Sequence, residues 1–280
     1  MTIRIVTDSA CDLPDSVATE HGIGIVPLTI RFGDQEFIDR VELSTADFWA
    51  RCAQQSTLPE TAAPAPGQFE AMYRQMHAEG ATGIVVVSLS GALSATYQSA
   101  ELASRSVVEV IPVRVVDSRS VTLGIGSIAL AASRLAADGS SLDEVEAFVV
   151  DRARRTKVFG ALDTLDNLKK GGRIGNAKAL LASALAIKPI IEVVDGAVEQ
   201  GGKQRTRGKA LKFLVEKVRE YEGRISDLAV LHADCSDVDE FVEMLRPFHS
   251  GEIVVGEIGP VIGTHAGRGT IGVAFDVRDQ

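Results

Sequence analysis

The chain of 280 residues has little of what several protein classes require. Its three cysteines, Cys11, Cys52 and Cys235, form an odd and scattered set that gives neither a disulfide framework nor a zinc-binding spacing. Aromatic residues make up only 5%, with one tryptophan, which argues against a stacking surface for single-stranded nucleic acid. Basic residues are outnumbered as well: 29 Lys and Arg against 38 Asp and Glu give a net charge of −9, the wrong sign for a nucleic-acid-binding face.

Long apolar runs are also missing. The longest apolar stretch, 179–191, is broken by Ser183, Lys188 and Pro189, so it is too short and too interrupted to span a bilayer. Met1 leads directly into the apolar run 3–7, without the basic and apolar segments of a signal peptide. Together with the cysteine usage, these absences predict a cytoplasmic protein with no stable membrane insertion.

The residues that are present, 45% hydrophobic and 24% charged, are typical of a soluble globular protein. In the first half, short apolar runs alternate with helical patterns. The apolar runs are 3–7, 24–28, 83–88 and 110–116, and the helical patterns are 14–20, 46–54, 69–77, 94–102, 121–137 and 142–154. Because continuous Val/Ile runs alternate with helices, we expect a parallel sheet covered on both faces. The proline-rich segment 57–67 has no periodicity and is predicted to be a loop.

The second half has a different composition. Lysine is absent from 1–156, and all nine lysines follow it, which predicts two α/β domains, 1–156 and 157–280. Asp195-Gly196 between two apolar segments predicts a β-hairpin with a type I′ turn. The later patterns are strands at 157–162, 227–232, 252–258 and 269–277, and helices at 207–221 and 238–245. We therefore expect a mixed α/β domain after the parallel one.

Hydroxyl side chains gather where the predicted parallel strands end, which is where open α/β sheets bind ligands. Thr7-Asp8-Ser9 and Asp117-Ser118 follow two of these strands, and Ser94 stands at the predicted start of a helix. Ser94 would cap that helix, whose free N–H groups would accept an anion. Further candidates are Arg173 in a Gly-Gly turn and His265 inside the glycine-rich tract 256–269, predicted to be a loop. The five histidines are too scattered to predict a metal cluster.

Several blocks, in order along the whole chain, resemble the DegV family of bacterial fatty-acid-binding proteins, the FakB type. The blocks are IVTDS at 5–9, Thr61 with PAPGQF at 64–69, LSATYQSA at 93–100, VDS at 116–118, LKKGGRI at 168–174, KPI at 188–190 and IGPVIGTH at 258–265. Each block alone is weak, but seven in this order are specific. The sequence departs from the family in Ala62-Ala63, where a Ser-Gln pair is usual, and in Ala95, where glycine is usual.

The resemblance implies two α/β domains with a fatty acid in an apolar tunnel between them. A partner fatty-acid kinase would phosphorylate the presented carboxylate to an acyl-phosphate for phospholipid synthesis, so this chain would not be catalytic alone. By the same resemblance, Thr61 and Ser94 would bind the carboxylate, with Ala95 and His265 beside it. Arg173 and Arg205 would lie at the head-group region or at the rim facing the kinase. The resemblance implies no metal and no cofactor other than the bound lipid, and we expect a monomer.

Two other interpretations stay open at this point. Ser94 and His265 could be the nucleophile and base of an acyl-ester hydrolase, with Asp8 or Asp117 orienting the imidazole. The chain could also carry another amphipathic acid, such as a polyprenyl or sterol acid. The binding function is favoured because the sequence contains no G-x-S-x-G nucleophile elbow.

Overall fold

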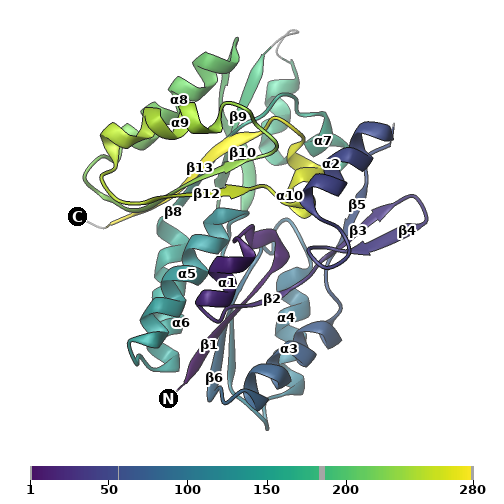
Figure 1. Cartoon of the computed structure of the whole chain (residues 1–280), viewed down its shortest axis with the longest axis vertical. Coiled ribbons are helices and arrows are strands. Elements are labelled where there is room, and N and C mark those ends of the chain that lie inside the picture. The colour runs from purple at the N-terminus through teal and green to yellow at the C-terminus, as the bar shows by residue number, and fades with distance from the viewer. Residues whose placement is uncertain (1, 56, 183–186, 279–280) are drawn as a thin grey trace.

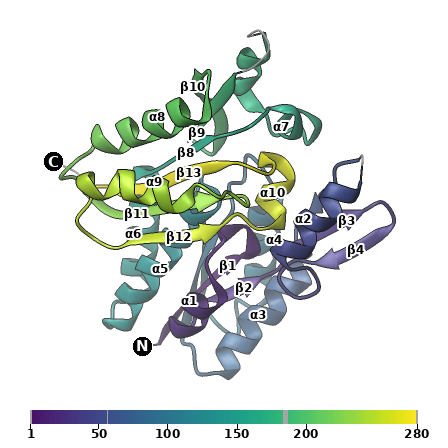
Figure 2. The same ribbon diagram turned by 45° about the horizontal axis from the view of Figure 1, so that its top comes forward.

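The computed structural model describes residues 2–55, 57–182 and 187–278, and its strands form three sheets. Figure 1 shows most of the purple to teal first half of the chain in the lower part of the molecule and the green to yellow second half above it. Each half contributes one large sheet, and Figure 2 shows the same two layers from a second direction. The expected fold class, a parallel N-terminal sheet followed by a mixed C-terminal sheet, is confirmed.

The N-terminal sheet is entirely parallel and has helices on both faces, as the alternating pattern predicted. Its strands, in spatial order, are β2 (Gly24–Val26), β1 (Ile3–Asp8), β6 (Gly83–Ser88) and β7 (Val113–Asp117). Its helices are α1 (Asp15–Glu20), α3 (Pro66–Ala78), α4 (Thr96–Ser106), α5 (Leu123–Ala137) and α6 (Leu142–Arg155). Along β6, Ile84 and Val86 pack with α3 and α4, and Val85 and Val87 pack toward α5. Both faces are buried, which is why the strand is continuously apolar.

The C-terminal sheet is mixed. Its strands, in spatial order, are β10 (Ala197–Gln204), β9 (Lys188–Val194), β8 (Thr156–Ala161), β13 (Ile271–Val277), β11 (Ile225–His232) and β12 (Ile253–Glu257). Only β11 and β12 pair in parallel, and the other neighbours are antiparallel. Between β9 and β10, Asp195 and Gly196 have φ values of 49° and 81°, which confirms the predicted type I′ turn. Helices α8 (Arg207–Arg219) and α9 (Val238–Leu245) cover one face.

Helix α5 lies between the two large sheets. Its ten buried residues pack against β1 on one side and against Val158, Leu231 and Ala274 of the C-terminal sheet on the other. Burial against both sheets explains why most of this helix is apolar, while Arg134 near its end is exposed. The predicted boundary near residue 156 falls between α6 and β8, but one core cluster crosses it. The division into domains 1–156 and 157–280 therefore stays a prediction.

A small antiparallel sheet was not expected from the sequence. It consists of β4 (Gln35–Ile38), β3 (Thr29–Phe32) and β5 (Glu60–Ala62), beside helix α2 (Thr45–Gln54). Two more short helices, α7 (Asp166–Lys170) and α10 (Pro260–Ala266), were also missed, together with the 3₁₀ turns η1 (Ser9–Cys11), η2 (Gly175–Ala182) and η3 (Arg246–Phe248). Elements this short do not complete enough periods to give a pattern.

The apolar stretch 179–191 is only partly covered, because residues 183–186 lie outside the described residues. In the described parts of the chain, no helix has the length and apolar character needed to cross a membrane.

Candidate ligand-binding site

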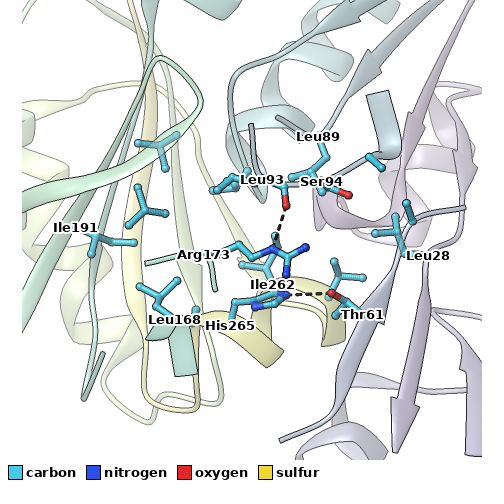
Figure 3. Close-up of a pocket in the computed structure, with 17 residues that line it drawn as sticks. Leu28, Thr61, Leu89, Leu93, Ser94, Leu168, Arg173, Ile191, Ile262 and His265 are labelled. Atoms are coloured by element: carbon cyan, nitrogen blue, oxygen red, sulfur yellow. Dashed lines mark hydrogen bonds between the residues drawn. The ribbon is translucent and has the colours of Figure 1, made fainter. Parts of the chain in front are cut away.

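An apolar cavity of about 190 Å³ opens between the two halves of the chain. Its aliphatic walls come from the loops that follow strands of the N-terminal sheet, from β9 and β10 of the C-terminal sheet, and from helices α7 and α10. These wall residues are Leu28, Leu89, Leu93, Val121, Leu168, Ile191, Val193, Val198, Val261 and Ile262. Figure 3 shows four polar side chains, Thr61, Ser94, Arg173 and His265, converging on one part of this cavity. An aliphatic chamber with polar groups gathered in one place suits an amphipathic ligand.

Thr61 lies on β5 and not in a loop, which corrects the prediction for 57–67. Strand β5 pairs antiparallel with β3, and Thr61 stands opposite Ile30. Since side chains alternate along a strand, Glu60 and Ala62 are exposed and Thr61 faces inward. At the two positions where the sequence departs from the family, the side chain of Ala62 therefore points to solvent, while Ala63 lines the cavity.

His265 lies in the last turn of α10, which corrects the expectation of a glycine-rich loop. Pro260 occupies the first turn, where its fixed φ favours helix and its missing N–H costs no hydrogen bond. The imidazole Nε2 lies 3.0 Å from the Thr61 hydroxyl oxygen, joining residues 204 positions apart. Gly171 makes room for the ring: a Cβ there would lie 2.3 Å from the His265 Nδ1.

The His265 imidazole is neutral at physiological pH. Burial, with the positive charge of Arg173 as a second cause, lowers its pKa to about 4. Nδ1 is buried without a hydrogen-bond partner among the described residues. A buried N–H without an acceptor costs more than an unused lone pair, so we infer that the proton is on Nε2. Nε2–H then donates to Thr61, which leaves the Thr61 O–H free to donate to a ligand.

Ser94 stands in the turn before α4. The backbone amides of Leu93 and Ser94 both donate to the Ser90 carbonyl, so α4 begins at Thr96, two residues later than predicted, with Ala95 at its N-cap. The Ser94 hydroxyl still accepts from the first helical amide, that of Thr96, at 3.3 Å, and it lies 2.8 Å from the Thr96 hydroxyl. Ser94 and Ala95 both line the cavity at this helix N-terminus.

Arg173 is part of the cavity wall. The chain leaves α7 through Gly171 and Gly172, and the φ of 69° at Gly172 turns it back toward the loop before α4. The guanidinium donates from Nε to the Leu93 carbonyl at 3.1 Å and from Nη1 to the Gly171 carbonyl at 2.8 Å. Figure 3 shows it between the 89–94 loop and His265. A cation therefore stands beside Ser94 and His265.

Arg205 lies apart from this group. It is exposed at the start of the turn between β10 and α8, and it is not among the residues that line the cavity. Of the residues singled out from the sequence, the structure thus brings together Thr61, Ser94, Ala95, Arg173 and His265, and leaves Arg205 outside.

The hydrogen bonds of a Ser-His-Asp triad are not made among the described residues. Ser94 bonds to Thr96, while His265 bonds to Thr61. Asp8 is fully buried and accepts from the amides of Leu89 and Ala10 at 2.7 and 3.1 Å. Asp117 accepts from Gly91 and Arg119. Both acids hold loops, so neither orients the imidazole.

Sequence reasoning missed the aliphatic wall of the cavity and the role of Asn167. Its amide donates to the Thr264 carbonyl at 3.1 Å and so ties α7 to α10. No local signal distinguishes a cavity-lining leucine from a core leucine, because both belong to the same apolar periodicity. Within the described part of the chain, no group of three or more His, Cys, Asp or Glu residues is placed to hold a metal ion.

Known proteins match this chain over most or nearly all of its length. A family profile described as an uncharacterised protein of the DegV family matches residues 2–278. A DegV domain-containing protein of Streptomyces coelicolor is 38% identical over 280 residues, covering 99% of each chain. One from Clostridium perfringens is 37% identical over 215 residues, covering 77% of this chain and 76% of that one.

Solved structures of DegV-family and related fatty-acid-binding proteins match this chain as well. A DegV-family protein from Thermus thermophilus, described as fatty-acid binding, matches with a TM-score of 0.90 and 33% identity over 99% of this chain and 100% of that one. A protein from Thermotoga maritima, also described as having a fatty-acid-binding function, matches with a TM-score of 0.86 and 30% identity over 99% of each chain. By sequence and by fold, this chain belongs to the DegV family.

Proposed function

We propose that this protein binds a long-chain fatty acid in the cavity between its two halves. The observation that carries the proposal is the convergence of Thr61, Ser94, Arg173 and His265 on one part of an otherwise aliphatic chamber. A carboxylate needs hydrogen-bond donors and benefits from a cation, and these side chains supply two hydroxyls and a guanidinium. The fatty-acid binding described for the Thermus and Thermotoga relatives supports the same ligand.

The acyl chain would supply most of the binding free energy. Burial of about 15 methylenes contributes roughly 12 kcal/mol at ~0.8 kcal/mol each. Association costs of about 4–15 kcal/mol offset that gain, so tight binding requires a cavity that is largely formed beforehand. The polar groups then fix which end of the ligand lies near Thr61 and His265.

The further part of the proposal is that the bound carboxylate is presented to a separate fatty-acid kinase. A carboxylate beside Arg173 would attack the γ-phosphoryl group of ATP held by that kinase, which gives an acyl-phosphate and ADP. Phosphoryl transfer needs positive charge near the reacting oxygens, and the acidic chain has Arg173 at the cavity and Arg205 at the surface to provide it. In this function the chain is a carrier and not an enzyme by itself.

The first prediction is that the protein purifies with close to one equivalent of fatty acid and that Ser94→Ala weakens its binding. Loss of one donor to a charged acceptor should cost about 1–3 kcal/mol, roughly a 5- to 150-fold higher dissociation constant. Native mass spectrometry measures the occupancy, and titration with oleate after delipidation measures the affinity. Ser104→Ala is the control, because Ser104 lies at the far end of α4 and donates to the Glu101 carbonyl.

Reaction with a serine-directed phosphonate distinguishes the carrier function from the alternative hydrolase function. A carrier should give no covalent adduct at Ser94 and should not turn over acyl esters. Modification of Ser94 together with ester hydrolysis would refute the carrier function, and the absence of both lipid and oleate uptake would refute the fatty-acid ligand.

The second prediction distinguishes the roles of Arg173 and Arg205. Arg173→Gln should weaken fatty-acid binding about tenfold or more and also lower acyl-phosphate formation, because its guanidinium stands at the cavity. Arg205→Ala should leave lipid occupancy unchanged and still lower acyl-phosphate formation, measured with the partner kinase and ATP. Arg219→Ala, an exposed arginine at the end of α8, serves as the control. Equal acyl-phosphate yields from wild type and Arg205→Ala would contradict a role of Arg205 at the surface that faces the kinase.

A further inference from the structure

A second cavity, of about 510 Å³, shares no lining residue with the first. It lies between the chain segment after β1, the start of α2 and the end of β12. Its polar lining consists mainly of Ser9, Asp12, Asp15, Asp39, Arg40 and Glu257. Figures 1 and 2 both show α2 beside α10, whose first residue, Pro260, lines this cavity.

The lining has an excess of negative charge. Four carboxyl groups face one guanidinium, and that guanidinium is already engaged. Arg40 donates from Nε to Asp15 at 3.1 Å, and its Nη2 donates to Asp15 and to the Leu13 carbonyl. Asp12, Asp39 and Glu257 therefore have no ion-pair partner among the described residues of this lining, although the Arg40 charge still acts on Asp12 and Asp39.

Two of these acids are buried with hydrogen-bonding capacity unused. Asp39 is 1% exposed and Asp12 is 7% exposed. Of their four carboxylate oxygens, only Asp12 Oδ1 has a well-formed bond, from the Gly259 amide at 3.0 Å, and the other three accept none from the described residues. The Thr122 hydroxyl lies near Asp12, and the Ser9 hydroxyl and the Arg40 amide lie near Asp39, without completing such a bond. Buried acceptors without donors are costly, so this arrangement suits a ligand that brings N–H groups.

A metal ion fits these residues less well than an organic cation. Nowhere in the described ranges do three or more His, Cys, Asp or Glu side chains converge in the way that a metal ion requires. The rest of the lining includes apolar surface from Leu13, Leu43, Val255 and Pro260. A cationic head on an aliphatic stem would use both kinds of surface.

We propose that this cavity binds an aliphatic ammonium ion, whose N–H groups donate to Asp12 and Asp39 while its methylenes contact the apolar part of the lining. Glu257 and Asp15 are exposed and lie in the same lining, so a second ammonium on the same ligand would find carboxylates there. The ammonium comes from a free amine or from a lysine side chain, and the chemistry of recognition is the same for both.

Binding of the cation should release protons. Burial raises the pKa of Asp12 to about 7 and that of Asp39 to about 6. The Asp39 charge raises the pKa of Asp12 further and the Asp15 charge that of Asp39, whereas the Arg40 charge lowers both. An ammonium beside them favours the ionised form. The affinity should therefore rise as the pH is raised through the range of about 6 to 7.

Calorimetric titration of the full chain with diaminobutane tests the proposal, and butanediol serves as the neutral ligand of the same length. We expect the diamine to bind with proton release at about pH 6 and to bind more tightly at about pH 8 than at about pH 5.5, and we expect no binding of the diol. Asp39→Asn and Asp12→Asn should each lower the diamine affinity about tenfold or more. Asp34→Asn should not, because Asp34 is an exposed acid in the β3–β4 turn outside this lining.

The source of the ammonium is distinguished by a second ligand, lysine blocked at both its amino and carboxyl ends. Binding of blocked lysine as tight as that of diaminobutane assigns the site to a protein side chain, and weaker binding assigns it to a free amine. Melting curves of the two Asn variants show that they are folded. Equal binding of diol and diamine, or unchanged diamine affinity in both folded variants, would overturn the proposal, as would displacement of the diamine by Mg²⁺ at equal concentration.

Discussion

Replacing Val193 with tryptophan should weaken fatty-acid binding more than about 100-fold while the chain remains folded. Val193 lies on β9, is 7% exposed and lines the apolar cavity. The indole would occupy space that the acyl chain needs. Exclusion of about four methylenes costs roughly 3 kcal/mol at ~0.8 kcal/mol each, which is more than a 100-fold loss of affinity. Native mass spectrometry and oleate titration measure this loss.

The neighbouring residue provides a matched control. Val194 is on the same strand but is 39% exposed, since successive side chains point to opposite faces. Val194→Trp should keep full lipid occupancy. Overpacking at Val193 costs about 1–3 kcal/mol of stability, so the melting curve of each variant is compared with that of wild type. A folded Val193→Trp protein that still carries one equivalent of fatty acid would show that the ligand binds elsewhere.

The free energy of unfolding should decrease as the pH is raised from about 4.5 to about 6.5. The cause is a group of three buried carboxyls. Burial raises the pKa of Asp8 and of Asp39 to about 6 and that of Asp12 to about 7, from 3.8 in each case. Within this range the native state holds more protons than the unfolded state, so stability falls with rising pH. Each such group contributes a slope of up to about 1.4 kcal/mol per pH unit.

One buried base opposes this trend. Because burial lowers the pKa of His265 from 6.5 to about 4, its neutral form is favoured in the native state and its contribution to stability rises with pH over the same range. Three carboxyls outweigh one imidazole, so the net slope is negative. Urea unfolding at a series of pH values measures it, and the Asp12→Asn, Asp39→Asn double variant should flatten it. A slope that stays the same in the double variant would contradict the assignment to these acids.

The sequence alone determined the elements whose cause is local. Continuous Val/Ile runs such as 83–88 predicted strands buried on both faces, and the structure has a parallel sheet with helices on both sides. Asp195-Gly196 supplied the two positive φ values of the hairpin turn. Three polar residues of the cavity lining, Thr61, Ser94 and His265, were also singled out from the sequence through family motifs, and this did not require the local structure of those motifs to be predicted correctly.

Only the tertiary structure decided how these residues meet. Thr61 and His265 are 204 positions apart, and their contact depends on a three-residue strand and a seven-residue helix that are too short to give a periodic signal. The register of β5 turns Ala62 outward and Thr61 inward, and no pattern within 57–67 encodes that register. The two cavities likewise lie between segments that are far apart in the sequence and whose side chains do not fill the space between them. Apolar periodicity reports which side chains are buried, but whether they meet each other or line a cavity depends on the packing of distant segments.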